Sequence, residues 1–329
     1  MPKQIRWGIL STAKIGVRAV IPAIQASSNG VVAAIASRDL QAAQDAAKAL
    51  NIPQAYGSYQ ALLESPDIDA VYIPLPNHLH AEWTIQAARQ RKHILCEKPF
   101  ALNAIEAGEM VDAAKENQVQ LMEAFMYRFH PQYAKIKQLL AEHVVGKIQI
   151  IRIAFCFTLN RPNDIRLNKE MGGGAVMDVG CYCVNLARLI ADAEPIEVQG
   201  KAIFGKTGVD MTLAGLLRFS NNIIATFDCS FESDYTEWLQ IQGTEGRLDI
   251  PRPIKPMLNP AEIIVRRGEK SDAMATLQTH TVPGANHYQL MVEHFADAIL
   301  NGKPMQFPAE DARANMRVLD GLLVSAGGI

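Results

Sequence analysis

Short apolar runs alternate with helix-period segments over residues 5–123, and this alternation restricts the fold more than any other feature of the chain. Five runs have the continuous apolar character of strands buried on both faces: 5–10, 31–36, 70–73, 93–96 and 119–122. Four Ala-rich segments carry apolar positions at three- and four-residue spacing: 14–27, 39–50, 81–91 and 104–117. This order is typical of crossover helices packed on a parallel sheet. The sequence therefore predicts an α/β fold that begins with a doubly wound domain over residues 1–125.

The pattern changes after residue 125 and predicts a second domain over residues 126–329. A linking helix over 133–142 is followed by strand-like runs at 147–157, 197–204, 211–219, 223–231, 235–242, 247–250, 261–266 and 276–282. In the run 223–231 the odd positions are apolar and most even ones polar, as in an antiparallel sheet with one half-exposed face. Helices are expected near 287–300 and 309–326. We therefore predict an α+β domain with an open, mainly antiparallel sheet, and a C-terminal helix within 309–329 that returns to pack on a domain such as the first.

The composition excludes several classes of protein. With 329 residues, of which 49% are hydrophobic and 20% charged, the chain is long enough for two domains. A net charge of -2 with scattered Lys and Arg gives no basic surface for nucleic acid. No apolar run is long enough to span a bilayer, and the start runs directly into a strand, so we expect a cytoplasmic protein without nucleic-acid or membrane partners. The cysteines form no Cys-x-x-Cys pair and are expected to be small buried side chains: Cys96, Cys156, Cys181, Cys183 and Cys229.

The turn after the first strand is the place to look for a dinucleotide fingerprint. The consensus Gly-x-Gly-x-x-Gly is replaced there by a degenerate version that ends in Gly16. Ser11 and Ala13 are small enough to let backbone amides approach a pyrophosphate, and Gly16 permits close packing of helix on strand. A compact strand-to-helix turn without a ligand is the alternative, but the position at the start of a βαβ unit favours a cofactor. The expected cofactor-binding residues of this turn are Ser11, Thr12, Ala13, Lys14 and Ile15.

The end of the second strand indicates which cofactor the domain would bind. Enzymes that use NAD place an acidic side chain here for the ribose 2′-hydroxyl, whereas this strand ends in Ser37 and Arg38. Arg38 can form charge-assisted bonds to a 2′-phosphate, and Ser37 adds a neutral donor. Alternatively Arg38 is only solvated, while Asp39 caps the next helix in either case. We predict NADP in preference to NAD.

Two histidines follow the strand at 70–73, in the segment 74–80. His78 and His80 lie near Glu82, but the two rings would point in different directions and no further ligand is close in sequence, so we expect no metal site. A loop over the cofactor crevice, with Asn77 capping the next helix, is the better interpretation. The cofactor contacts expected from this loop are Leu75, Asn77 and His80.

Lys98 directly follows the apolar run 93–96 in the segment Cys96-Glu97-Lys98-Pro99. A lysine at the carboxyl-end crevice of a sheet costs several kcal/mol to bury unpaired, so it is usually paired or used in chemistry. The bond to Pro99 can adopt the cis form, which would aim the side chain over the crevice. The alternative is an ordinary surface lysine.

The second domain contributes a glycine-rich segment that turns into a helix. Gly172-Gly173-Gly174 permits a sharp turn, after which Asp178, Tyr182 and Asn185 share one helix face. A polar stripe on an otherwise apolar helix must be hydrogen-bonded internally or line a cavity, and mutual bonding of Asp178 and Tyr182 is the alternative to a functional role. In the preceding loop, Arg161 and Arg166 are expected to be solvated, with substrate or cofactor binding as the alternative.

These motifs together resemble the glucose-fructose oxidoreductase / inositol dehydrogenase / MocA (Gfo/Idh/MocA) family over nearly the whole chain. The resemblance is carried by the turn Ser11–Gly16, Pro76-Asn77-x-x-His80, Glu97-Lys98-Pro99, and the glycine run with Asp178 and Tyr182. It implies an N-terminal Rossmann domain, a C-terminal open-sheet domain and a homodimer or homotetramer, which we expect to form through the half-exposed sheet. Inositol-dehydrogenase-like members carry histidine where this chain has Tyr182. The match is closer to the glucose-fructose oxidoreductase and dimeric dihydrodiol/D-xylose dehydrogenase branch.

The resemblance implies a dehydrogenase acting on CH–OH groups, with Lys98 catalytic and Glu97 beside the cofactor. Oxidising an alcohol needs groups that bond the substrate oxygen and accept its proton while hydride passes to nicotinamide. Our hypothesis is that Tyr182 exchanges the proton, Lys98 makes the tyrosine more acidic and stabilises the oxyanion, and Asp178 anchors a substrate hydroxyl and orients Lys98. The small-molecule substrate is expected to be a sugar, polyol or dihydrodiol. Alternatives are a non-catalytic NADP-sensing regulator of the same fold and a reductase of a different carbonyl or imine.

Overall fold

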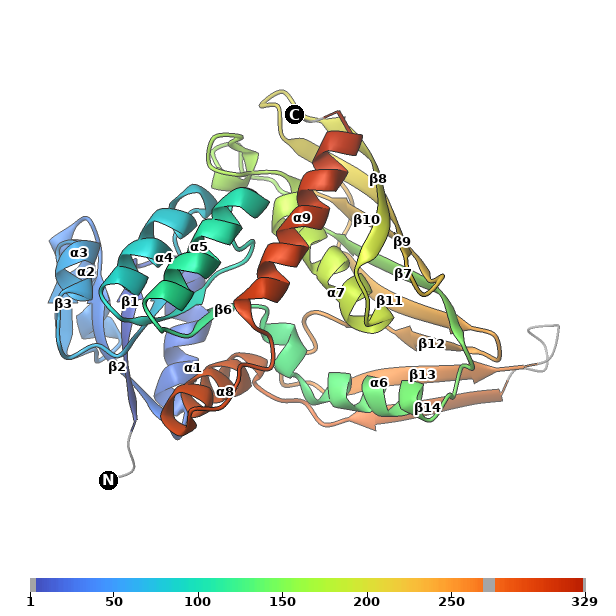
Figure 1. Ribbon diagram of the computed structural model, residues 1–329, viewed down its shortest axis with the longest axis horizontal. Coiled ribbons are helices and arrows are strands. Elements are labelled where there is room, and N and C mark those ends of the chain that lie inside the picture. The colour runs from blue at the N-terminus through green and yellow to red at the C-terminus, as the bar shows by residue number, and fades with distance from the viewer. Residues whose placement is uncertain (1–3, 269–275, 328–329) are drawn as a thin grey trace. The chain divides into compact units, whose positions relative to one another are not determined.

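The computed structural model describes residues 4–268 and 276–327, which form two compact units (Figure 1). The first unit contains the residues up to Met126 and the segment Asn286–Met316. The second contains Tyr127–Ala285 and the residues from Arg317 onward. In this division the first stretch of the first unit ends at Met126, one residue beyond the boundary predicted at 125. The C-terminal end is divided differently, because the segment 286–316 was expected in the second domain.

The first unit is built on a six-stranded parallel sheet with the order β3-β2-β1-β4-β5-β6. The strands are β1 (Ile5–Leu10), β2 (Gly30–Ala36), β3 (Gln54–Tyr56), β4 (Ala70–Ile73), β5 (His93–Cys96) and β6 (Leu121–Glu123). This is the doubly wound order, in which the direction of strand succession reverses between the central strands β1 and β4. Ligands of such sheets bind at the carboxyl ends of the strands. The predicted doubly wound domain is confirmed. The edge strand β3 was missed because its three residues are partly exposed and have no apolar run.

Helices follow the strands as crossovers. They are α1 (Ile21–Ala26, preceded by a π-helix over Gly16–Val20), α2 (Leu40–Ala49), α3 (Tyr59–Leu63), α4 (His80–Arg89) and α5 (Ala104–Glu116). Asp39 and Asn103 each accept two backbone N–H bonds as N-caps of α2 and α5, and the cap at Asp39 was predicted. The predicted cap at Asn77 is wrong, because a 3-10 turn over Asn77–Leu79 comes first and α4 begins at His80 with no side-chain cap bond.

The segment 286–316 joins the first unit through aromatic packing. It contains α8 (His287–Asn301) and the start of α9 (Ala309–Ser325). The ring of Phe295 in α8 lies 5.3 Å from that of Trp7 in β1, and both side chains are fully buried. Lys115 of α5 pairs with Glu310 of α9 at 2.8 Å. Burying a Trp and a Phe together favours this placement of α8 over one in the second unit.

The second unit is built on an eight-stranded sheet with the order β14-β13-β12-β11-β7-β10-β9-β8. The strands are β7 (Ile148–Cys156), β8 (Pro195–Phe204), β9 (Asp210–Phe219), β10 (Ile224–Ser230), β11 (Thr236–Gly243), β12 (Arg247–Ile250), β13 (Ala261–Arg267) and β14 (Thr276–Val282). All neighbouring pairs are antiparallel except β7 and β10, which run parallel. The predicted open, mainly antiparallel sheet is confirmed. Helices α6 (Pro131–Ala141) and α7 (Cys181–Ala191) accompany this sheet.

The sheet of the second unit has one face without a helix within the described ranges (Figure 1). A hydrogen-bonded polar network crosses this face from β7 to β13. Arg152 donates to Gln240 and Gln242 at 2.7 Å, and Gln240 donates to Asp249 at 2.8 Å. Asp249 also accepts from Arg266 at 2.8 Å. The half-exposed face predicted from the sequence is therefore present, and it is more polar than the pattern indicated.

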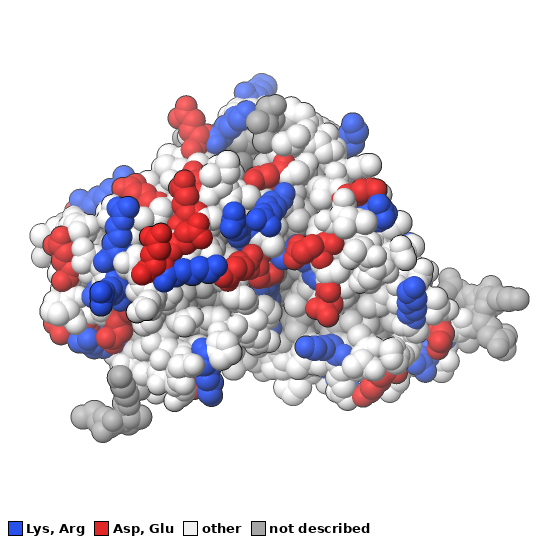
Figure 2. Space-filling view, viewed as in Figure 1, with Lys and Arg blue, Asp and Glu red and all other residues white. Residues whose placement is uncertain are grey.

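The surface charges, the hydropathy of the helices and the cysteines fit what the composition indicated. On the face shown in Figure 2 basic and acidic side chains are interspersed. None of the helices within 4–268 and 276–327 is both long and apolar enough to cross a bilayer. All five cysteines are free and buried, as predicted.

Candidate active site

Ser11 shapes the turn between β1 and the first helix. Its φ of 127° lies in the region that favours glycine, and it stands at the first glycine position of the fingerprint. Its hydroxyl accepts a bond from the Ala13 N–H at 3.2 Å and donates to the Pro74 carbonyl at 3.3 Å. The turn after β1 is thereby joined to the loop after β4. A Cβ at Gly16 would lie 3.5 Å from the side chains of Pro74 and Tyr72, which is ordinary van der Waals contact, so the close packing at this position does not by itself require glycine.

At the end of β2 the Arg38 guanidinium is exposed, and the adjacent Asp39 carboxylate is already hydrogen-bonded. The Asp39 carboxylate accepts from the Gln41 and Ala42 N–H groups and is committed to capping α2. Ser37 accepts from the Asp39 N–H at 3.2 Å. Arg38 is exposed and lies beside Tyr59, whose pKa is raised by burial and lowered to a smaller extent by the guanidinium. These groups suit a dinucleotide with a 2′-phosphate, because the exposed charge is positive and the nearest carboxylate is already bonded.

Lys98 occupies the turn after β5, where Glu97 is anchored from both sides. The hydroxyl of Tyr72, in β4, donates to Glu97 Oε1 at 2.5 Å, and the Lys98 N–H donates to Glu97 Oε2 at 3.2 Å. Burial, followed by the charge of Glu97, raises the pKa of Tyr72 well above its usual value. Tyr288, in α8, has a pKa raised by burial and by Glu97, which the Lys98 ammonium partly opposes. Lys98 is half-buried beside a fixed carboxylate, and its bond to Pro99 is cis.

His80 ties two loops together at the same edge of the sheet. Its ring is fully buried, with Nδ1 2.9 Å from the Pro99 carbonyl and Nε2 2.8 Å from the Leu75 carbonyl. Burial lowers the pKa of His80 to about 4, although the two carbonyls act in the opposite direction. Both ring nitrogens face main-chain oxygens, so the ring positions the loops at Leu75 and Pro99. Neither ring nitrogen is left to bond a cofactor, so a cofactor contact of His80, as predicted from the sequence, would be made by another part of the residue.

The glycine run of the second unit makes the sharp turn predicted for it. Gly172 and Gly174 have φ values of 75° and 122°, and a Cβ on Gly173 would lie 2.4 Å from the Arg166 carbonyl oxygen. The chain then enters a π-helix over Val176–Gly180 that continues as α7. A β-carbon at any of these glycines would disturb the turn. The turn therefore fixes where the helix with Asp178 and Tyr182 starts.

The polar stripe on this helix divides into a structural part and a more accessible part. Asn185 is fully buried and accepts bonds from the Tyr127 hydroxyl and from Arg128 Nε. Tyr182 is 5% exposed, and its ring lies 5.6 Å from that of Phe155 and 5.9 Å from that of Tyr127. The side chain of Asp178 is 19% exposed. Asn185 serves the fold, whereas Asp178 retains access to solvent.

Arg166 contacts Asp178, and its expected solvation is wrong. Its guanidinium donates to Asp178 Oδ2 at 3.2 Å and to both oxygens of Asp164 at 2.8 and 2.9 Å. It also lies over the Phe157 ring, 5.4 Å from the centroid. The bonds from Arg166 hold the pKa of Asp164 below its usual value. Arg161 is exposed, as expected.

The sequence did not reveal Tyr72, Tyr288 or Arg166 as neighbours of the predicted site residues. The partner of Tyr72 lies on the adjacent strand, and Tyr288 enters from a segment near the end of the chain. The only sequence signal was the place of Tyr72 near the end of the apolar run 70–73, which indicates a residue at the carboxyl end of its strand. The residues that the structure describes contain no group of three His, Cys, Asp or Glu able to hold a metal ion.

Comparison with known proteins identifies the family. The family profile for the oxidoreductase family with NAD-binding Rossmann fold (GFO_IDH_MocA) matches residues 5–125, and the GFO/IDH/MocA C-terminal domain matches residues 133–249. The chain is 39% identical to D-xylose 1-dehydrogenase (NADP(+)) 2 of Haloferax volcanii, with 97% of each chain covered. It is 34% identical to trans-1,2-dihydrobenzene-1,2-diol dehydrogenase of Xenopus tropicalis, with 90% of each covered.

A solved structure with the same fold is that of KijD10, a 3-ketoreductase from Actinomadura kijaniata in complex with NADP and TDP-benzene. It has 30% identity, 98% coverage of both chains and a TM-score of 0.90. Variants of KijD10 with a lysine replaced by alanine and with a tyrosine replaced by phenylalanine are also similar, with TM-scores of 0.87 and 0.92.

The fold and these matches define an oxidoreductase with a Rossmann domain for a nicotinamide dinucleotide. The chain belongs to the Gfo/Idh/MocA family, and it is an NAD(P)-dependent oxidoreductase.

Proposed function

We propose that this protein is an NADP-dependent oxidoreductase that interconverts a hydroxyl and a carbonyl on a sugar, polyol or dihydrodiol. The observation that carries the proposal is the position of Lys98: it directly follows β5 at the carboxyl edge of the sheet, where sheets of this order bind dinucleotides, and its backbone N–H donates to the Glu97 carboxylate. The preference for NADP is supported by the exposed Arg38 and the committed carboxylate of Asp39. It is also supported by two similar proteins, the NADP(+) D-xylose 1-dehydrogenase of Haloferax volcanii and KijD10 in complex with NADP.

NADP, when bound, supplies the site that takes up or gives hydride. Tyr182 exchanges a proton with the reacting oxygen of the substrate, and the Lys98 ammonium stabilises negative charge that develops on that oxygen. Asp178 accepts a hydrogen bond from a substrate hydroxyl, in an orientation fixed by its bond to Arg166. These roles use one acid/base group, one cation and one hydroxyl acceptor, which is the set that oxidation of a polyhydroxylated substrate needs.

The KijD10 variants support the choice of Lys98 and Tyr182. The lysine and the tyrosine that were substituted in KijD10 are separated by the same number of residues as Lys98 and Tyr182 here. A protein that only senses NADP would have no need for both groups. We therefore favour an enzyme over a non-catalytic regulator.

A substrate panel tests the function. Aldoses, polyols, dihydrodiols, keto sugars and an imine would be incubated with NADP(H) or NAD(H), and turnover followed by the nicotinamide absorbance. We expect turnover of a polyhydroxylated substrate with NADP, and a loss of about 10²- to 10⁴-fold in kcat for Lys98→Met and Tyr182→Phe. Arg161→Met, an exposed residue of the same loop as Arg166, is the control and should retain its rate. Full kcat in Lys98→Met with undiminished NADPH binding would refute the mechanism.

Cofactor choice has its own test. Removing the Arg38 guanidinium should weaken NADP binding by about tenfold or more and leave NAD binding nearly unchanged, because only NADP carries the 2′-phosphate. Binding would be followed by fluorescence titration of Arg38→Ala and the native protein. Unchanged NADP affinity in the variant would overturn the assignment.

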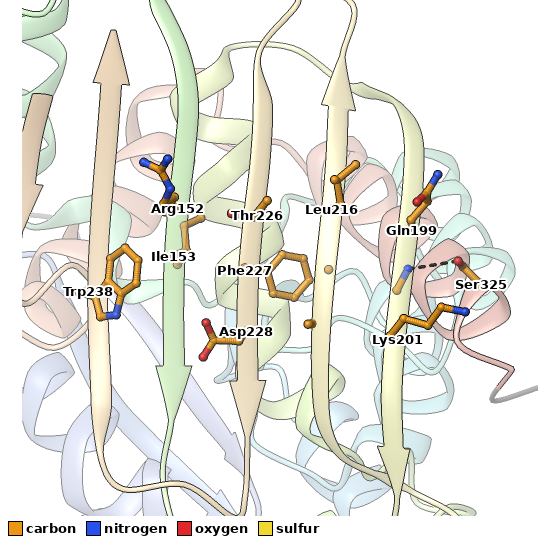
Figure 3. Close-up of a pocket in the computed structure, with 13 residues that line it drawn as sticks. Arg152, Ile153, Gln199, Lys201, Leu216, Thr226, Phe227, Asp228, Trp238 and Ser325 are labelled. Carbon is orange, nitrogen blue, oxygen red and sulfur yellow. Dashed lines mark hydrogen bonds between the residues drawn. The ribbon is translucent and has the colours of Figure 1, made fainter. Parts of the chain in front are cut away.

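We also propose that a second copy of the chain covers the free face of the eight-stranded sheet. A hollow of about 790 Å³ lies over β11, β7, β10, β9 and β8 (Figure 3). In the register of the sheet, Trp238, Asp228 and Lys201 stand in one row, with only alanines between them. Both signs of charge and a large aromatic ring on one surface suit a self-complementary, two-fold interface.

Sedimentation measurements would test the interface. The native protein should sediment as a dimer or tetramer and Trp238→Glu as a smaller species. Leu258→Glu is the matched control, because Leu258 is a strongly exposed apolar residue that is not part of the hollow. A native monomer, or an assembly unaffected by Trp238→Glu, would exclude this surface.

A further inference from the structure

The helix that carries Asp178 and Tyr182 begins without a cap from its own neighbourhood. A helix start leaves several backbone N–H groups without intrahelical acceptors, and a Ser, Thr, Asp or Asn just before the helix usually accepts one or two of them. Here the preceding residues are Gly172–Ala175, and the N-cap Ala175 makes no side-chain cap bond. The acceptor must therefore come from another part of the chain.

Asp210, the first residue of β9, supplies this acceptor. Its Oδ2 accepts a bond from the Val176 N–H at 2.7 Å, and the residue is only 2% exposed. Burial raises the pKa of Asp210 to about 6, while bonds from the Val176 and Ala175 backbone act in the opposite direction. A buried carboxylate held mainly by backbone N–H groups is costly to keep charged, and its bonds are correspondingly directional.

The glycine run makes room for this carboxylate. A Cβ on Gly174 would lie 2.1 Å from Asp210 Oδ1, and the φ of Gly174 is 122°. Gly174 O also accepts the bond from the Asp178 N–H at 3.1 Å. Gly174 therefore both packs against the Asp210 carboxylate and accepts the hydrogen bond from the Asp178 backbone.

We propose that Asp210 is a positioning residue for the reaction: by clamping the start of this helix it sets where Asp178 and Tyr182 stand toward the substrate. The inference rests on the proposed function, which gives those two side chains their roles. Asp178 lies two residues beyond Val176, the amide that Asp210 holds, so a shift of the first turn passes directly to its carboxylate. A displacement of about 1 Å at a substrate-binding group can cost on the order of 10²-fold in rate.

The variants Asp210→Asn and Asp210→Ala test the clamp. The asparagine keeps one acceptor oxygen, so we expect it to retain more activity than the alanine. We expect kcat/KM to fall by about tenfold in Asp210→Asn and by about 10²-fold in Asp210→Ala, with NADP affinity unchanged. Asn103→Ala is the matched control, because it also removes an acceptor of two helix N–H groups but lies in the first unit, and its kcat/KM should stay within about twofold of the native value.

Hydrogen exchange tests the clamp by Asp210 independently of the proposed enzymatic function. The amides of residues 175–178 should exchange faster in both Asp210 variants and at the native rate in Asn103→Ala. If the native enzyme turns over a substrate and Asp210→Asn and Asp210→Ala keep its kcat/KM, positioning by Asp210 is refuted while the proposed function stands. If the native protein turns over nothing in the panel, the proposed function fails, and unchanged exchange in Asp210→Asn would separately refute the clamp.

Discussion

The buried ring of His80 should make the folded protein less stable as the pH falls below about 7. Both ring nitrogens face main-chain carbonyls, at 2.9 and 2.8 Å, which favours a doubly protonated ring, whereas complete burial favours a neutral one. Burial prevails and lowers the pKa from the usual 6.5 to about 4. Between these two values the unfolded chain binds a proton that the folded chain does not bind.

The size of the effect follows from this pKa difference. The contribution of His80 to stability is complete above pH 6.5 and is lost as the pH falls toward about 4. From about pH 7.5 to about pH 5, the loss is about 2 kcal/mol, because each pH unit inside the window is worth ~1.4 kcal/mol. In His80→Gln, which has no titrating ring, this part of the acid dependence should be absent.

Urea denaturation of both proteins at the two pH values measures the effect. The stability advantage of the native protein over His80→Gln should be smaller by about 2 kcal/mol at the lower pH. Groups such as Asp210, whose raised pKa makes an opposite contribution, are common to both proteins and cancel in the difference. An advantage that stays constant, or that grows on acidification, would mean that the folded ring is protonated and donates to both carbonyls, and the reasoning would be wrong.

Three further substitutions have defined outcomes. Gly174→Ala places a Cβ against a carboxylate at positive φ and should lower the free energy of unfolding, measured by urea denaturation, by about 2–4 kcal/mol. Gly302→Ala, also at positive φ but with nothing within 4 Å, should lower it by about 1 kcal/mol. Equal losses would contradict this reasoning. Arg166→Met removes the partner of the site carboxylate and should lower kcat/KM about tenfold, with Arg161→Met as the unaffected control. Asn103→Ala should cost about 1 kcal/mol of stability, and a loss of activity as well would show that this cap does more than stabilise α5.

The sequence predicted the two sheets well because their strands are marked by local patterns. Continuous apolar runs identified the buried parallel strands, and alternation identified the antiparallel ones. The strand β3 and helix α3 were missed, since segments of three and five residues are too short to show a period. The helix α8 was assigned to the wrong unit, because nothing in its own sequence specifies that Phe295 packs on Trp7.

The candidate site was predictable in its residues but not in their connections. Lys98 and Asp178 stand out from sequence, yet the bond from Arg166 to Asp178 and the carbonyl partners of His80 depend on how separated loops meet. Asp210 was not recognised at all. Its acidic side chain at the start of a strand looks ordinary until the distant helix start it holds is known.

The packing of Phe295 on Trp7 has a consequence for the order in which the protein can form during synthesis. Trp7 lies in β1 and leaves the ribosome early, whereas its aromatic partner comes from near the end of the chain, after the whole eight-stranded sheet. Domains generally acquire structure from the N-terminus as they emerge, and exposed apolar surface on a nascent chain invites aggregation. Trp7 therefore has no Phe295 to pack on until α8 has been synthesised, and we expect chains truncated before α8 to depend on chaperones to stay dispersed.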